Sequence, residues 1–197
     1  LEDLTESVNH VMRSFGHAEH SRDAVRGFVG NGVRNLMRRA VPGGEDNPAF
    51  EDELKAQIEY YRAHGLGATK PYEGVDEMLD TLRQRGMSIA ILSNKEEVAV
   101  KNLCAHFFAG RYDLALGNTP SRPRKPDPAI LVAAFEQFQA VPSEVLYVGD
   151  SETDAKTAEN AGIDYILVTW GFRDRELLET FHPKALIDTP GELISYV

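Results

Sequence analysis

The stretch VLYVGDSETDAKTAENAG, residues 145–162, decides the fold. Its apolar run VLYV predicts a buried β-strand, and the residues after the strand predict a helix. Two carboxylates, Asp150 and Asp154, lie at the junction, four residues apart. Ser151 and Asp154 have a structural explanation, because a serine N-cap with an acid three positions later is typical of a capping box. Asp150 has no such explanation, so its place at the tip of a strand indicates a functional role.

The same alternation of short apolar runs and helices extends from Val75 to the C-terminus. This pattern is typical of a parallel sheet covered by helices on both faces, and it predicts an α/β fold with a Rossmann-like core. Ligands of such sheets bind at the carboxyl ends of the strands. The apolar runs predict strands near residues 88–92, 112–116, 145–148, 165–168 and 185–188.

Residues 1–69 differ from the rest because their apolar side chains recur at helical spacing, as Leu4, Val8, Val11 and Met12 do. We therefore expect a small helical domain at 1–69 and the α/β core at 70–197. The apolar stripe could line a cofactor groove, but the core of a helix bundle is the simpler interpretation.

Composition narrows the classes of partner. The 197 residues carry a formal net charge of −10, which disfavours nucleic acid and anionic membrane as partners. No apolar run approaches the roughly 20 residues that span a bilayer. The single cysteine, Cys104, allows no intrachain disulfide and favours a cytoplasmic location. A small phosphorylated ligand remains compatible with the charge, since a local site can override the global field.

Two other segments place polar residues near expected strand ends. Ser93 and Asn94 follow the apolar run near residues 88–92, and they could either bind an anion or cap the next helix. Lys125 stands in RKPDP between rigid residues, where its ammonium group could face a phosphate or carboxylate. Asp150 and Asp154 offer oxygen ligands of the kind Mg²⁺ prefers. All of these residues together predict a phosphate and Mg²⁺ site far more specifically than any one of them.

The motifs LSN at 92–94, RKPDP at 124–128 and GDSETD at 149–154 resemble the second, third and fourth motifs of the haloacid dehalogenase superfamily. The similarity is greatest to its phosphoglycolate-phosphatase-like branch, and it covers nearly the whole chain. Residues 1–69 resemble the small cap domain of that branch, and FVGNGVRNLMRRA at 28–40 is similar to its cap segment.

The resemblance implies a Mg²⁺-dependent phosphomonoester hydrolase that works through an aspartyl-phosphate intermediate. Ser93 would bind the transferring phosphoryl group with Asn94 beside it, and Lys125 would neutralise charge on the phosphate and the nucleophile. Asp150 would bind Mg²⁺, and Asp154 would support the metal directly or through water. The chemistry agrees, because phosphoryl transfer depends on positioning and charge neutralisation.

One family motif, D-x-D-G-T, is absent from the 197 residues. It carries the nucleophilic and general-acid aspartates, and we expect it upstream of Leu1, on a central strand between those that end at Ser93 and Asp150. The 197 residues alone are therefore expected to be inactive. The alternative is a catalytically silent module that keeps the site for binding or regulation.

The resemblance also suggests 2-phosphoglycolate as the substrate. Other small phosphate esters, pyrophosphate, and the phosphonatase and dehalogenase reactions remain alternatives. Gly30, Asn31 and Gly32 form a turn that could touch the substrate or merely connect two helices. Arg34 could meet a substrate carboxylate, or it could be a surface charge.

Overall fold

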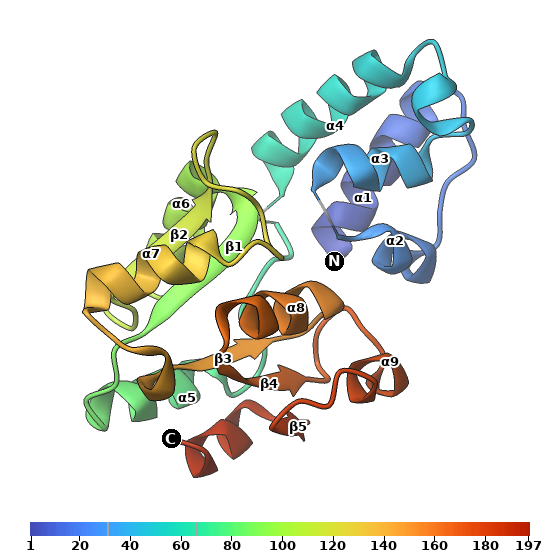
Figure 1. Ribbon diagram of the computed structural model, residues 1–197. Coiled ribbons are helices and arrows are strands. Elements are labelled where there is room, and N and C mark those ends of the chain that lie inside the picture. The colour runs from blue at the N-terminus through green and yellow to red at the C-terminus, as the bar shows by residue number, and fades with distance from the viewer. Residues whose placement is uncertain (31, 66) are drawn as a thin grey trace. The chain divides into compact units, whose positions relative to one another are not determined.

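The computed structural model describes residues 1–30, 32–65 and 67–197, and the chain divides into two compact units, Leu1–Lys70 and Pro71–Val197 (Figure 1). The first unit is helical in its described residues, as the sequence predicts. Its helices are α1 (Glu2–Ser14), α2 (Arg22–Phe28), α3 (Val33–Ala40) and α4 (Phe50–His64), with a short 3-10 turn η1 (Gly44–Asp46).

The helical unit has its own apolar core. The predicted stripe on α1 is buried, since Val8, Val11 and Met12 have no exposed surface. They pack against side chains of α2, α3 and α4, among them Val25, Met37 and Phe50. The stripe is therefore bundle core in this unit.

The second unit alternates helices and strands. Each predicted strand is present, with bounds that differ by one to four residues. The elements are α5 (Val75–Gln84), β1 (Ala90–Glu96), α6 (Glu97–Phe107), β2 (Leu114–Asn118), α7 (Ala129–Phe138), η2 (Pro142–Glu144), β3 (Leu146–Gly149), α8 (Glu152–Ala161), β4 (Asp164–Val168), α9 (Arg175–Glu179), β5 (Ala185–Ile187) and η3 (Pro190–Ser195).

Strand β4 shows why the unit is layered. Tyr165 and Leu167 point to a core that includes residues of α7, α8 and α9, while Ile166 and Val168 point to a core with α5 and η3. Successive side chains of a strand face opposite sides of a sheet, so an apolar strand needs helices on both faces. The α/β class and the doubly wound core are therefore confirmed.

The strands form two parallel sheets rather than one. One sheet pairs β1 with β2, the other has the order β3-β4-β5, and no described residues form a ladder between β1 and β3. The split falls between the two strands that we expect to flank a central strand absent from these 197 residues. Helix α7 packs on both sheets, with Ile130 and Ala134 against β1 and β2, and Leu131 against β3 and β4.

Two local features differ from the sequence expectation. Strand β1 extends to Glu96, because its pairing with β2 resumes there after an irregularity that follows Leu92. Helix α9 was not anticipated, since five residues are too short to show helical periodicity. In the described part of the chain, no helix combines the length and apolar character needed to cross a bilayer.

Candidate functional site

Lys125 is the centre of the polar cluster at the strand ends. Its ammonium Nζ donates to Asp154 Oδ1 at 2.7 Å and to the Tyr147 hydroxyl at 3.1 Å. It also lies 3.4 Å from the Leu92 carbonyl oxygen, so the side chain bridges the β1 and β3 strand ends. The side chains of Lys125 and Asp154 are only 10% and 7% exposed. A buried lysine is therefore held in place by an ion pair rather than solvated.

Asp154 is the most fully engaged carboxylate of the unit. Oδ1 accepts from Lys125 and from the Tyr147 hydroxyl at 2.9 Å, while Oδ2 accepts from the Ser151 hydroxyl at 2.6 Å and the Asp150 amide at 3.2 Å. Burial acts to raise the pKa of Asp154, but the Lys125 charge and the hydrogen bonds outweigh burial and lower it. These contacts favour the charged form of Asp154, which holds the Lys125 ammonium group in place. Ser151 is the N-cap of α8, as predicted.

Asp150 lies beside this pair, but its surroundings favour its charged form less than those of Asp154 do. Its Oδ2 accepts from the Phe172 amide at 2.8 Å. Burial and the neighbouring Asp154 charge raise the pKa of Asp150, although Phe172 and Lys125 act in the opposite direction. A carboxylate in this state gains from a nearby cation, because a cation compensates both the lost hydration and the repulsion.

Asn94 fixes the backbone of Lys125. Its amide makes two hydrogen bonds, accepting from the Lys125 N–H at 2.8 Å and donating to the Lys125 carbonyl at 3.0 Å. Ser93 Oγ accepts from the Lys95 amide at 3.1 Å, and the hydroxyl keeps its own proton to donate. Neither residue caps α6, which begins at Glu97. Hydrogen bonds therefore join Asn94, Lys125, Asp150 and Asp154, and Ser93 directly precedes Asn94 in the same unit.

Sequence reasoning missed a support of this cluster. Tyr147 is 8% exposed, and its pKa is raised well above the ordinary value by burial and by Asp154. Arg122 makes its contacts outside this cluster, since it donates to Glu97 at 2.7 Å and to the Gly117 carbonyl at 2.8 Å. A tyrosine inside the apolar run VLYV is the only sequence signal that could have identified this support.

Gly149 is the last residue of β3, and no side chain fits at this position. A Cβ on Gly149 would lie 2.2 Å from the Cβ of Asp154, a distance that real Cβ atoms do not show. The backbone of Gly149 at the strand end therefore packs directly against the side chain of Asp154 in the first turn of α8. This close approach brings Asp150 and Asp154 onto one side of the cluster.

The other candidate residues belong to the helical unit. Gly30 and Gly32 adopt positive φ angles of 129° and 88°, and Gly32 precedes the first residue of α3. Arg34 pairs with Glu51 at 2.6 Å and Glu45 at 3.0 Å, so its charge is balanced within that unit. Asn31 lies outside the described residues. A substrate-binding role for these four residues stays a prediction.

The carboxylates can be tested for fit to a divalent cation. Asp154 already accepts four hydrogen bonds, whereas Phe172 engages only one oxygen of Asp150 by a backbone amide. No three His, Cys, Asp or Glu side chains of the described residues gather into a metal cage. Mg²⁺ commonly uses one or two carboxylates together with water and phosphate oxygens. Asp150 therefore fits Mg²⁺ as a direct ligand, and Asp154 fits as support.

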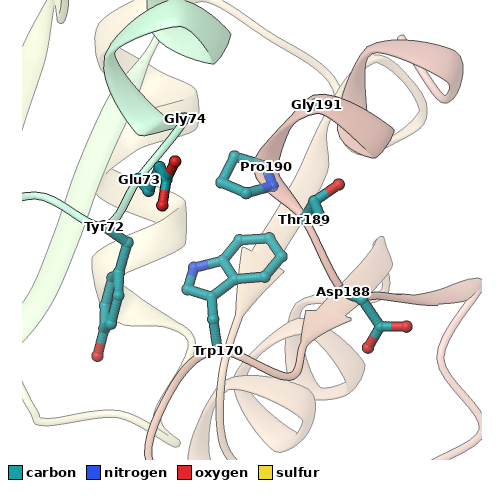
Figure 2. A pocket seen from close by; sticks show the side chains of 8 residues that line it. All are labelled: Tyr72, Glu73, Gly74, Trp170, Asp188, Thr189, Pro190 and Gly191. Carbon is teal, nitrogen blue, oxygen red and sulfur yellow. The ribbon is translucent and has the colours of Figure 1, made fainter.

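A pocket of about 460 Å³ lies elsewhere in the same unit, near the ends of β4 and β5 (Figure 2). Figure 2 shows Trp170 in the middle of its wall, with Tyr72 on one side and Pro190 on the other. None of the polar residues around Lys125 lines it. The candidate site is therefore identified by its charges and hydrogen bonds, and this pocket is a neighbouring feature.

The chain is similar to known hydrolases over most of its length. Residues 1–168 match the family model described as haloacid dehalogenase-like hydrolase. A phosphoglycolate phosphatase from Vibrio vulnificus strain YJ016 is 31% identical over 202 residues, which cover 99% of this chain and 89% of that protein. Another, from Cereibacter sphaeroides, is 35% identical over 175 residues, covering 87% and 79%.

The fold has close counterparts among solved structures. A crystal structure from Lactobacillus delbrueckii subsp. bulgaricus, of a protein assigned provisionally as a phosphoglycolate phosphatase, superposes with a TM-score of 0.92 at 28% identity. It covers 98% of this chain and 90% of the other. Since the family model matches most of the chain and the relatives exceed 30% identity, the chain belongs to the haloacid dehalogenase-like hydrolase family.

Proposed function

We propose that the protein is a Mg²⁺-dependent phosphomonoester hydrolase that acts on a small phosphorylated metabolite, with 2-phosphoglycolate as its substrate. The observation that carries the proposal is the cluster of Lys125, Asp150 and Asp154 at the ends of parallel strands. The names of the relatives support the choice of substrate. Lys125 and a Mg²⁺ ion held by the carboxylates would together neutralise a phosphoryl group that carries several negative charges.

The residues of this chain divide the work between binding and neutralisation. Lys125 supplies a positive charge whose position is fixed through Asp154 and Asn94. The Ser93 hydroxyl donates a hydrogen bond to a phosphoryl oxygen. Asp150 holds Mg²⁺, which when bound neutralises charge on the phosphate oxygens. Because Lys125 and Asp154 already pair in the free site, their arrangement needs no rebuilding when the substrate arrives.

The nucleophile, in this proposal, stands on a further strand between β1 and β3. The break between the two sheets supports it, as each of these strands pairs on one side only in the described residues. Val148 of β3 is 36% exposed although its strand neighbours in sequence lie in an apolar run. An added strand would bury this surface and satisfy the free edges. The D-x-D-G-T motif would then place its first aspartate beside Lys125 and Asp150, where an aspartyl-phosphate can form.

The experiment compares two forms of the protein, the 197 residues and a form with a D-x-D-G-T strand ahead of Leu1. We expect phosphate release from 2-phosphoglycolate only in the second form, only with Mg²⁺, and with a loss of at least a hundredfold on Asp150→Ala. A panel of other phosphate esters and pyrophosphate establishes the preferred substrate.

Three results would contradict the proposal. Release by the longer form that is indifferent to Mg²⁺ or to Asp150→Ala would exclude the mechanism. Phosphate or substrate binding with no turnover by the longer form would instead favour the silent binding module. Phosphonate cleavage or halide release would assign another reaction of the family.

A further inference from the structure

The segment directly after β4, Trp170–Arg173, contacts the strand end that carries Asp150. The Phe172 amide donates to Asp150 Oδ2 at 2.8 Å. One residue further, the Arg173 guanidinium donates two hydrogen bonds to the Glu152 carboxylate, from Nε at 2.6 Å and from a terminal nitrogen at 3.0 Å. The two loops are thus joined at two consecutive points.

Gly171 makes this contact possible. A Cβ on Gly171 would lie 2.2 Å from both Cβ and Oδ2 of Asp150. The backbone of the segment therefore lies directly against the Asp150 side chain, and it limits the rotamers that Asp150 can adopt. An aspartate that was placed only by its own strand would keep more freedom about χ1 and χ2.

The Arg173–Glu152 pair has the geometry of a fixed connection. Both nitrogen–oxygen contacts are short, and the Arg173 side chain is only 14% exposed. A bidentate arginine–carboxylate pair fixes orientation as well as distance, which a lysine cannot reproduce. Glu152 itself lies in the first turn of α8, between Asp150 and Asp154. The pair therefore fixes the segment after β4 to residues 150–154, which carry Asp150 and Asp154.

We propose that Arg173 and Glu152 form a positioning pair, which holds the backbone of Gly171 and Phe172 against Asp150 and so sets the orientation of its metal-binding carboxylate. This inference rests on the proposed function, because it assigns Asp150 to Mg²⁺. Residues that orient a metal ligand through hydrogen bonds change metal affinity by 10- to 100-fold when they are replaced.

Charge and positioning predict opposite signs for Arg173. If Arg173 acted only by its charge, Arg173→Gln would remove a cation near the site and tighten the binding of a divalent ion. If Arg173 positions the segment, the same variant weakens binding despite the favourable charge change. Arg173→Lys keeps the positive charge but cannot make the bidentate contact with Glu152. A positioning role therefore predicts weaker binding of the divalent ion in this variant too.

The test measures Mn²⁺ binding directly, by the electron paramagnetic resonance of free Mn²⁺, in the whole protein with the strand that bears the nucleophile. We expect Arg173→Gln, Arg173→Lys and Glu152→Gln each to raise the Mn²⁺ dissociation constant about tenfold. The double variant Glu152→Gln/Arg173→Gln should be little worse than either single one, because both remove the same connection. Circular dichroism and the melting temperature establish that each variant is folded.

Arg175→Gln is the matched control, since Arg175 also pairs with carboxylates in the segment that follows β4 but contacts Glu179 and Asp188 instead. It should bind Mn²⁺ as the wild type does. Unchanged or tighter binding by both folded Arg173 variants would overturn the inference while leaving the proposed function intact. A wild-type protein that neither binds Mn²⁺ nor releases phosphate would refute the proposed function, and this inference with it.

Discussion

Among the described residues, each unit of the molecule buries one acidic side chain, and the two differ in how many hydrogen bonds they accept. Asp154 of the α/β unit is 5% exposed, and Glu53 of the helical unit is not exposed at all. Asp154 accepts four hydrogen bonds from four residues. Glu53 contacts His17 at 2.9 Å through one oxygen, and among the described residues its other oxygen has no partner.

The difference teaches how much structure is needed to hold a charge in a fixed place. Asp154 draws donors from Lys125, Tyr147, Ser151 and the Asp150 backbone, so the Lys125 segment and the β3–α8 segment converge on it. Glu53 lies on α4, and His17 is the one side chain of the described residues that contacts its carboxylate. A buried polar group without a partner costs stability, whereas a fully satisfied network restricts the structure to one arrangement. The acid with the complete network is the one at the candidate site.

The largest effect is expected for Asp154→Asn, which breaks the network at its centre. Lys125 would keep a buried charge without its anionic partner, which costs about 3 kcal/mol or more of the free energy of unfolding. Phosphate release should fall at least a hundredfold, because the ammonium group loses its position. Urea unfolding and steady-state kinetics measure both effects. If the variant keeps wild-type stability and rate, Asp154 does not anchor Lys125.

Gly171→Ala should give the next largest effect. The new methyl group would collide with Asp150, and we expect a loss of about 1–3 kcal/mol in the free energy of unfolding. Metal-dependent activity should fall with it. Gly191→Ala is the control, since a Cβ there meets no atom within 4 Å. Equal stability of the two variants in a chemical unfolding experiment would contradict the close approach of the segment to Asp150.

A third prediction concerns Glu97, an acid of intermediate exposure. Hydrogen bonds from Lys101 and Arg122 lower its pKa to about 2. Because its folded pKa lies below the unfolded value of about 4.5, its contribution is complete above pH 4.5 and is lost as the pH falls towards 2. We expect about 1 kcal/mol, reduced by solvent screening. Glu97→Gln should flatten the pH dependence of unfolding in that window, and an unchanged slope would exclude the contribution.

The smallest effect is expected for Glu53→Gln. An amide at this position could still accept from His17 and could donate to Gln57, whose buried Oε1 also has no partner among the described residues. Glu53 and Gln57 are one helical turn apart on α4, so they share a face. The free energy of unfolding should change by less than about 1 kcal/mol. A loss as large as that of Asp154→Asn, measured by the same urea titration, would remove the contrast between the two acids.

Much of the site could be predicted from the sequence because its residues follow strand ends. The rule that ligands bind at strand ends predicts one cluster, and all of its members lie in one unit: Ser93, Asn94, Lys125, Asp150 and Asp154. Their individual contacts could not be predicted. Asn94 has both of its amide atoms on the Lys125 backbone, 31 positions away in sequence, and no local pattern encodes such a distance.

The supporting residues were missed for the same reason. Tyr147 and Arg173 are ordinary in their local sequence, and each acquires its role from a partner brought near by folding. Helix α9 was missed because it is too short to show a period. In contrast, the split between β1 and β3 falls where the sequence lacks the expected central strand.

By itself the sequence determined the alternation of helices and strands and the polar residues at the strand ends, because both depend on spacing along the chain. Only the tertiary structure decided which of the two carboxylates is held by Lys125 and which accepts a backbone amide from the segment after β4. That division depends on donors from β3, the N-cap of α8 and the segments after β2 and β4, which converge at distances of about 3 Å. Hydrogen bonds act only at such distances, so a carboxylate's charge and orientation are properties of its neighbours in space.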